Sequence, residues 1–276
     1  VNKNTTFNCT GSVRVGVETI HCSKRAGHGI QDLTTATANS CNPSFINMGF
    51  RIGADTYYDY MDAFGLFEPT GVDLQGEVAG IPADRETFVS SDIYVACYSF
   101  GQTFTVTPLQ LIAAQAACIN GGYLYTPYVV EQVKDSSGNI IMQHDATPVR
   151  QVVSEETSAT VREILEYVVS NGTGKNGQVA GYRIGGKTGT ADKTGTKDVV
   201  VSFLCFAPAD ATVTNVAGMT AEAAEARLAE YGFTDYRVVG EGDTVTDQTP
   251  LGGAIVPNNA EIILYMGEEK PDTLCS

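Results

Sequence analysis

Gly185-Gly186-Lys187-Thr188-Gly189-Thr190-Ala191 places one lysine and two threonines among three glycines. Glycine has no side chain, so the backbone amides of such a segment can approach a ligand closely. Upstream, the apolar residues between Val161 and Val168 recur at helical spacing, and Ser154 is a suitable N-cap for that helix. Downstream, Val199 to Phe206 is apolar and rich in β-forming residues, which predicts a buried strand. Lys187 is therefore expected between a helix and a strand.

The same segment also fits a nucleotide-binding pattern. Gly181 to Thr188 matches G-x-x-x-x-G-K-T, the phosphate-binding loop. That loop must follow a buried strand and open a helix at its lysine, so that the helix N-terminus faces the phosphates. Here Asn171 to Ala180 is polar and glycine-rich, and the residues after Lys187 carry no helical pattern. The context therefore disfavours a nucleotide site, and saturable nucleotide binding abolished by Lys187→Ala is the observation that would establish one.

Composition places the chain among acidic globular proteins. Its 276 residues are 43% hydrophobic and 18% charged, enough for one large domain or two modest ones with a substantial core. The formal net charge of −15 repels nucleic acid and anionic lipid, so no nucleic-acid partner is expected. No segment approaches the roughly 20 apolar residues of a membrane helix, and residues 1–6 lack a signal-peptide core.

The chain has seven cysteines, and none of them forms a C-x-x-C pair. Their scatter predicts no zinc or other metal site, and nothing in the sequence calls for a cofactor. Cys118 and Cys205 lie in apolar runs and are expected to be small buried side chains. Cys9 and Cys22 flank a valine-rich segment and could be cross-linked in an oxidising compartment. His28 lies between two glycines, where a histidine more often ties a turn together than acts as a base.

Two helix starts stand out elsewhere in the sequence. Ser40-Cys41-Asn42-Pro43 follows a short predicted helix, Asp32 to Ala38, and Pro43 suits the first turn of a second helix with Asn42 as its cap. On local chemistry alone, Ser40 and Asn42 are turn and capping residues. Further along, Thr107 to Gln110 forms a capping box around a proline, and the helix that follows is apolar on nearly all sides and therefore expected to be buried.

Together these motifs resemble the transpeptidase domain of class B penicillin-binding proteins. Lys187-Thr188-Gly189, followed by Thr190-Ala191, is similar to the K-T-G element of that family and of serine β-lactamases. Ser40-Cys41-Asn42, followed by the segment Phe45 to Ala54, looks like the S-x-N motif with the helix behind it. Pro69 to Glu77 and Val106 to Gln110 also resemble segments of the family, and the matches occur in the expected order.

The resemblance implies a mixed α/β (α+β) fold with an antiparallel sheet and flanking helices. Residues 1–210 are expected to form an incomplete transpeptidase domain that lacks the last strand and helix, because Ala207 to Asp210 runs directly into a segment of different composition. Residues 211–268 resemble a PASTA domain, a small β-α-β module, with a helix capped by Thr220. Its strands are expected at Tyr236 to Val239 and Glu261 to Met266, separated by a turn region. Residues 269–276 are expected to be a tail.

The resemblance also implies roles for individual residues. In the family, a serine in S-x-x-K attacks the penultimate D-alanine of a peptidoglycan stem peptide, and the acyl group then passes to an amine of a neighbouring strand. Carried over to this sequence, Ser40 would relay a proton and Asn42 would hold the amide of the acyl donor. Lys187 would supply positive potential beside them. Thr188 and Gly189 would bind the terminal carboxylate of D-Ala-D-Ala or of a β-lactam, and the backbone amide of Thr190 would form half of the oxyanion hole.

The S-x-x-K motif itself does not occur. No serine of the chain has a lysine three positions later, so the nucleophile is expected upstream of Val1, in a longer product. A membrane anchor in that product would hold the enzyme on the extracytoplasmic face of the bacterial membrane. The chain is thus expected to be an inactive fragment of a D-Ala-D-Ala transpeptidase, whose partners are stem peptides and β-lactams. The alternative is a non-catalytic wall protein that binds muropeptides through its PASTA-like segment. Labelling with fluorescent penicillin separates the two.

Overall fold

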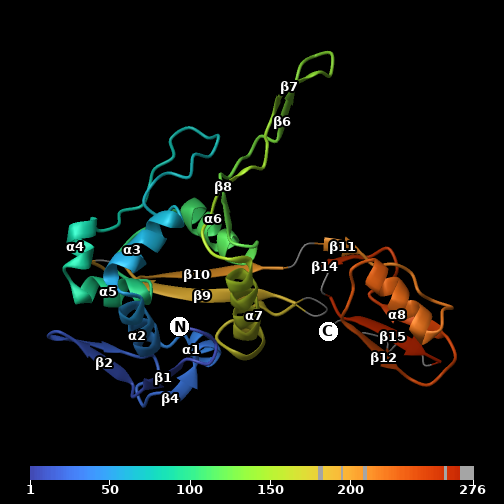
Figure 1. Ribbon diagram of the computed structural model, residues 1–276, viewed down its shortest axis with the longest axis horizontal. Coiled ribbons are helices and arrows are strands. Elements are labelled where there is room, and N and C mark those ends of the chain that lie inside the picture. Colours follow the sequence, from blue (N-terminus) through green and yellow to red (C-terminus); the bar gives the residue numbers. More distant parts are fainter. Residues whose placement is uncertain (180–182, 194, 208–209, 258–259, 268–276) are drawn as a thin grey trace. The chain divides into compact units, whose positions relative to one another are not determined.

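The chain folds into helices and strands in a computed structural model that describes residues 1–179, 183–193, 195–207, 210–257 and 260–267 (Figure 1). They form two units, the first made of Val1–Lys175 and Gly186–Leu204, and the second of Asn176–Gly185 and the residues from Cys205 onward. The expected mixed helix and strand class is confirmed. The domain boundaries expected at 1–210 and 211–268 stay a prediction, and the expected tail at 269–276 lies outside the described residues.

The first unit contains strands β1 to β8, helices α1 to α7 and most of strands β9 and β10. In chain order these are β1 (Thr6–Cys9), β2 (Ser12–Val15), β3 (Glu18–His21), β4 (Gly29–Asp32), α1 (Leu33–Ala38), α2 (Asn42–Ile52), α3 (Ala54–Ala63), α4 (Arg85–Val89), α5 (Asp92–Ser99), α6 (Pro108–Ile119), β5 (Tyr123–Tyr125), β6 (Gln132–Lys134), β7 (Ile140–Gln143), β8 (Pro148–Gln151), α7 (Glu155–Asn171), β9 (Gly185–Asp192) and β10 (Val199–Phe206). A short 3-10 turn, Lys175–Gly177, follows α7. Strands β1 and β4, β2 and β3, β5 and β8, and β6 and β7 form antiparallel pairs.

Two short helices flank the S-x-N segment. The Asp32 carboxylate accepts a hydrogen bond from the Thr35 amide and so caps α1, close to the helix start that the sequence predicts. The next helix, α2, begins at Asn42, with Cys41 in the N-cap position and no side-chain capping bond. The prediction that Asn42 caps this helix is therefore wrong. Its side-chain amide instead donates to the backbone carbonyl of His21, 3.0 Å away, a tertiary partner that local sequence does not reveal.

A cluster of aromatic rings joins α3, α4 and α5. Phe88 of α4 is fully buried at its centre. Its ring centroid lies 5.0–5.8 Å from those of Tyr57, Tyr58 and Tyr98 in tilted or edge-on arrangements. Such ring pairs add about 0.5–1.5 kcal/mol to the effect of buried area. Since α5 also packs on α2, the cluster supports the helix that begins at the S-x-N segment.

The predicted capping box of α6 is present and carries further contacts. The Thr107 hydroxyl accepts a hydrogen bond from the Gln110 amide, and the Gln110 side chain accepts one from the Thr107 amide. Gln110 is fully buried. Its Nε2 donates to the carbonyls of Leu66 and Glu68, and its Oε1 also accepts the amide of Gly80. One side chain therefore ties the start of α6 to two loops.

The rest of α6 is less buried than its composition predicts. Gln110, Ala114 and Ala117 are buried, whereas Ile112 is 56% exposed. The buried positions recur every three or four residues and so define one face of the helix. The prediction that α6 is buried on all sides is wrong, because in the described part of the chain only this face is covered.

Replacing Gln110 by alanine is expected to destabilise the chain by about 2–4 kcal/mol, because a helix cap and several buried backbone groups lose their partners. Urea unfolding followed by circular dichroism measures the loss. Gln115→Ala on the same helix is the matched control, because Oε1 of Gln115 is buried without a hydrogen-bond partner among the described residues. It is expected to cost at most about 1 kcal/mol, and equal losses for the two variants would contradict the assignment.

The helix predicted ahead of Lys187 is α7. The Ser154 hydroxyl accepts the Thr157 amide at its start, and Glu155 and Glu156 follow in the first turn, where carboxylates favour the helix dipole. The helix ends at Gly172 and packs against α1 and α6. It therefore leads the chain to the neighbourhood of the S-x-N segment before the K-T-G strand begins.

Strand β10 was expected to be buried, and this prediction is wrong. Val199, Val200 and Val201 are 50%, 56% and 72% exposed, and Cys205 is exposed as well, although an apolar run had suggested otherwise. The reason is the pairing, because among the described residues β10 pairs only with β9. In the part of the chain that the structure describes, no strand pairs with its other edge or covers its apolar side chains there. Cys118 of α6 is half-buried.

The second unit contains β11 (Asp210–Thr212), α8 (Ala221–Glu230), β12 (Tyr236–Val239), β13 (Val245–Thr249), β14 (Ile255–Pro257) and β15 (Ile262–Met266). Thr220 caps α8 as predicted, through a hydrogen bond from the Ala223 amide. The helix packs on a sheet in which β15 lies between β12, parallel to it, and β13, antiparallel to it. The sequence predicts β12 and β15, but β13 lies in the expected turn region. It is a strand because it pairs along β15 and buries Val245 and Gln248.

Candidate functional site

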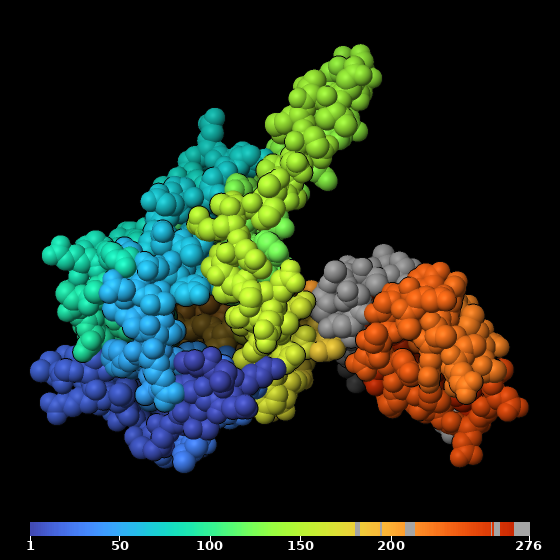
Figure 2. Space-filling view, viewed as in Figure 1, coloured from blue at the N-terminus to red at the C-terminus, as the bar shows by residue number. Residues whose placement is uncertain are grey.

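The structure brings the K-T-G lysine and the S-x-N serine together. Nζ of Lys187 on β9 donates a hydrogen bond to Oγ of Ser40 across 2.9 Å, although the two residues are 147 positions apart in sequence. The ammonium also donates to the backbone carbonyl of Thr188 at 2.8 Å. Figure 2 shows a depression in the surface of the first unit, between the blue N-terminal elements and the yellow-green segment that includes α7. The predicted convergence of Ser40 and Lys187 is thus observed.

Ser40 is held by the end of α1. Its φ angle is 49°, in the left-handed region that residues other than glycine seldom adopt. Two backbone hydrogen bonds fix this turn, from the Ser40 amide to the Thr37 carbonyl and from the Cys41 amide to the Ala36 carbonyl, each 3.1 Å long. The strained turn points the hydroxyl to Lys187 rather than leaving it to cap α2. Strain of this kind persists only where the surrounding structure enforces it.

Burial of Lys187 makes its charge costly. Gly185 and Gly186 before it are buried, and the lysine side chain is itself half-buried. Loss of hydration lowers the pKa of the Lys187 ammonium below its ordinary value of 10.5. A desolvated ammonium exerts a stronger field on its neighbours than one in bulk water. An anionic oxygen placed beside Ser40 would therefore be stabilised.

The end of α7 completes the framework of the site. A Cβ on Gly172 would lie 2.6 Å from the Ala38 carbonyl oxygen, so only glycine allows α7 to end against α1 this closely. The Thr173 amide then donates to that carbonyl at 3.0 Å. The hydroxyl of Thr188 donates to the hydroxyl of Thr173 at 3.1 Å, which links the K-T-G strand to this turn. Thr173 was not among the expected site residues, because its hydroxyl meets Thr188 only through the tertiary structure.

The remaining predicted residues lie near this contact without a demonstrated role. Asn42 is two residues from Ser40, and its amide is engaged by the His21 carbonyl. Gly189 lies on β9, where a Cβ would approach Oγ of Ser202 to 2.6 Å, so a side chain there would crowd β10. Thr190 is exposed on the same strand. Their parts in catalysis and binding stay predictions.

The structure also disfavours the nucleotide-binding alternative. Lys187 and Thr188 lie inside strand β9, whereas a phosphate-binding loop needs its lysine at the start of a helix. Gly181 and Tyr182, at the start of the matched string, lie outside the described residues. Without a helix N-terminus at Lys187, the backbone amides there do not form a phosphate cradle.

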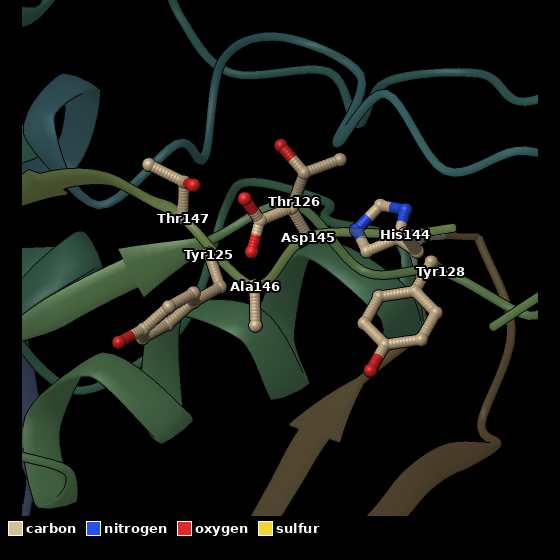
Figure 3. Close-up of a pocket in the computed structure, with 7 residues that line it drawn as sticks. All are labelled: Tyr125, Thr126, Tyr128, His144, Asp145, Ala146 and Thr147. Atoms are coloured by element: carbon tan, nitrogen blue, oxygen red, sulfur yellow. The ribbon is translucent and has the colours of Figure 1, made fainter. Parts of the chain in front are cut away.

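A separate hollow lies at the base of the β6–β7 hairpin, which projects from the first unit (Figures 1 and 3). Its volume is about 500 Å³, and the rings of Tyr128 and His144 stack on one side of it with their centroids 3.8 Å apart. The lining residues are Tyr125, Thr126, Tyr128, His144, Asp145, Ala146 and Thr147. None of them belongs to the S-x-N or K-T-G segments, so this hollow is not the site that the sequence predicts.

The disulfide that the sequence left open between Cys9 and Cys22 is not formed. Cys9 and Cys22 are both free thiols, and each is buried. Nδ1 of His28 lies 3.4 Å from Sγ of Cys22, so this histidine does hold its turn, through a sulfur contact that the sequence did not reveal. Separately, no helix in the described part of the chain combines the length and apolarity that a membrane span requires.

A half-buried ammonium that donates a hydrogen bond to a serine hydroxyl suits a site that binds an anion and passes a proton. Family profiles agree with the motifs that form it. The profile described as the penicillin binding protein transpeptidase domain matches residues 1–234, and that of the PASTA domain matches residues 211–268. The chain therefore belongs to the penicillin-binding protein transpeptidase family and carries a PASTA domain.

Individual relatives fit this assignment. The chain is 43% identical over 208 residues to stage V sporulation protein D of Bacillus subtilis, a match that covers 72% of this chain and 32% of that protein. It is 32% identical over 192 residues to penicillin-binding protein PbpB of Mycobacterium tuberculosis, covering 66% of this chain and 28% of the relative. The chain thus spans about a third of the length of the curated relatives it matches.

Solved structures share the fold. The ampicillin complex of penicillin-binding protein 3 from Mycobacterium tuberculosis superimposes with a TM-score of 0.67 at 28% identity, covering 74% of this chain and 48% of that one. The D,D-transpeptidase domain of a peptidoglycan glycosyltransferase from Eggerthella lenta gives a TM-score of 0.66 at 26% identity, covering 74% and 52%.

Proposed function

We propose that this chain is part of a serine-type peptidoglycan D,D-transpeptidase that cross-links the cell wall and is acylated by penicillin. The observation that carries the proposal is the 2.9 Å hydrogen bond between Lys187 and Ser40, which joins the two family motifs in one site. The relatives support the reaction class, since one of the similar solved structures is named a D,D-transpeptidase domain and another holds ampicillin.

In the proposed reaction a serine Oγ attacks the carbonyl carbon of the penultimate D-alanine. The C–N bond to the terminal D-alanine breaks, its nitrogen takes a proton, and an amine of a second strand later displaces the serine. Ser40 relays the proton between the nucleophile and the leaving nitrogen, and the positive charge of Lys187 lowers the cost of the anionic species. Asn42 holds the amide of the acyl donor, and the Thr190 amide supplies half of the oxyanion hole.

The nucleophile in this proposal is supplied by a part of the protein outside these 276 residues, because no serine of the chain is followed by lysine three positions later. The complete enzyme would work on the extracytoplasmic face of the membrane, where stem peptides and β-lactams meet it. The PASTA domain would contact the same polymer. A non-catalytic wall protein that binds muropeptides through its PASTA domain would leave the paired Lys187 and Ser40 without a catalytic role.

Acylation by penicillin tests the carboxylate site. In the longer protein that includes an S-x-x-K segment, Thr188→Val is expected to slow acylation by fluorescent penicillin about 10- to 100-fold, because a hydrogen bond to a charged group contributes about 1.5–3 kcal/mol. The matched control is Thr19→Val, which removes an exposed hydroxyl from strand β3. We expect no change for this control. Unchanged labelling of Thr188→Val would remove Thr188 from the site, and no labelling of the unaltered longer protein would overturn the proposed activity.

A further inference from the structure

Four side chains with metal-binding atoms meet beside the S-x-N segment. They are Cys9, Cys22, His28 and Cys41, and their donor atoms all lie within 4.8 Å of one another. The three cysteines are at most 1% exposed, and the histidine is half-buried. The wide spacing of the cysteines in the sequence predicts no metal site. That prediction does not hold against the fold, which brings three of them together with His28.

The spacing of the donor atoms suits a small tetrahedral cation. Sγ of Cys22 lies 3.4 Å from Nδ1 of His28 and 4.0 Å from Sγ of Cys41. Around zinc, with bonds of about 2.3 Å to sulfur and 2.0–2.1 Å to nitrogen, neighbouring ligand atoms are separated by about 3.6–3.8 Å. The cluster is therefore close to the size of a zinc shell, while a Sγ–Sγ distance of 4.0 Å is far from a disulfide bond of about 2.05 Å.

The main-chain segments that carry the cluster lie in close contact with one another. Cys9 ends β1 and pairs with Gly29 of β4. A Cβ on Gly27 would lie 2.3 Å from the carbonyl oxygen of Cys9, so glycine is required where the histidine loop crosses this strand. On the other side, the Cys22 amide donates to the carbonyl of Gly11 at 2.9 Å. Main-chain contacts thus hold Cys9, Cys22 and the loop that carries His28 in place.

Packing of the cysteines as small apolar side chains explains the cluster less well than metal binding does. Buried cysteines often act as small apolar side chains, but here a polar ring nitrogen faces a thiol at 3.4 Å among three sulfurs. Three thiolates and one imidazole form a closed set of the kind found in structural zinc sites, with no position left for water or substrate.

We propose that Cys9, Cys22, His28 and Cys41 bind one zinc ion as a structural site. Each thiol gives up its proton to solvent as the metal binds. Because Cys41 lies between Ser40 and Asn42, the ion would anchor the S-x-N segment to β1 and to the turn after β3. The metal site does not depend on the proposed transpeptidase activity, and its test uses metal binding alone.

The 276-residue chain, purified under reducing conditions and desalted, is expected to contain one zinc per chain by mass spectrometry of the metal. Replacing zinc with cobalt is expected to give an intense thiolate-to-cobalt charge-transfer band and the visible bands of a tetrahedral centre. Absence of bound zinc together with absence of these cobalt bands in the unaltered chain would overturn the proposal, as would non-reducing peptide mapping that finds two cluster cysteines joined in a disulfide.

Variants assign the ligands. Cys9→Ser and His28→Ala are expected to weaken zinc binding by more than about 100-fold, since loss of even an outer-shell partner costs roughly 10- to 100-fold. His28→Cys replaces the imidazole with a fourth thiolate ligand. This variant is expected to keep the metal and to shift the cobalt spectrum, an outcome that a folding defect would not produce. Cys205→Ser, at an exposed cysteine outside the cluster, is the matched control and is expected to leave metal content unchanged. Equal metal loss in Cys205→Ser and Cys9→Ser would contradict the assignment.

Discussion

Lys187→Ala is expected to lower the rate at which the longer, S-x-x-K-containing protein is acylated by penicillin by about 10²- to 10⁴-fold, the range that a positioned acid–base group contributes. The variant removes both the hydrogen bond to Ser40 and the charge that stabilises an anionic oxygen there. The measurement is the second-order rate of adduct formation with fluorescent penicillin. Because the group acts on the reaction rather than on the fold, unfolding by urea is expected to change little.

Lys193→Ala is the matched control for this substitution. Lys193 is exposed just beyond the end of β9 and lies on the same strand connection. The Lys193→Ala substitution removes the same charge from the protein but leaves the Lys187–Ser40 contact intact. The acylation rate is therefore expected to stay within about twofold, the effect of a screened surface charge. If both variants lost activity equally, the net charge of the protein and not the Lys187–Ser40 pair would explain the effect.

The pH dependence of acylation reports on the same lysine. Burial lowers the pKa of Lys187 below 10.5, so the ammonium loses its proton at a lower pH than an exposed lysine would. The reaction needs the charged form, and its rate is therefore expected to fall as the pH rises through that lowered pKa. Arginine stays charged throughout. Lys187→Arg is thus expected to retain part of the activity and to lose this alkaline decline, and an unchanged decline would assign it to another group.

Phe88→Ala is expected to reduce the free energy of unfolding by about 3–5 kcal/mol, as large cavities in aromatic cores do. Phe88 is fully buried, and three tyrosine rings contact it from α3 and α5. Loss of the ring leaves those tyrosines without a shared partner. Near-ultraviolet circular dichroism, which senses packed tyrosines, and urea unfolding measure the effect.

Phe50→Ala makes the same chemical change on α2, where the ring is 41% exposed. It is expected to cost about 1 kcal/mol or less, because little apolar surface returns to water. Comparable losses for Phe50→Ala and Phe88→Ala would show that the aromatic cluster does not hold α3, α4 and α5 together.

Helix ends were the features that sequence reasoning predicted best. Ser154, Thr107 and Thr220 each cap the helix that was expected to follow. A cap is a contact between residues two or three positions apart, so a short window of sequence contains all of it. The one failed cap, Asn42, has a partner 21 residues away on β3, and no local window contains that residue.

Burial was predicted less well, for a related reason. The runs at β10 and α6 are apolar, yet Val201 is 72% exposed and Ile112 is 56% exposed. An apolar run says that a segment can be buried, whereas burial itself requires another element to cover it. In the same way, β13 became a strand because β15 offered an edge to pair with, although its own residues suggested a turn.

The amino-acid order alone therefore determined the motifs, the helix starts and the family, because these depend on residue identity and short spacing. Only the tertiary structure decided the direct contact by which the predicted convergence of Ser40 and Lys187, 147 positions apart, is made. It alone also decided that three scattered cysteines and His28 meet in one place. Such contacts depend on how β1, α1, α7 and β9 are packed. Packing sums many weak interactions over the whole chain, and no single segment encodes the result.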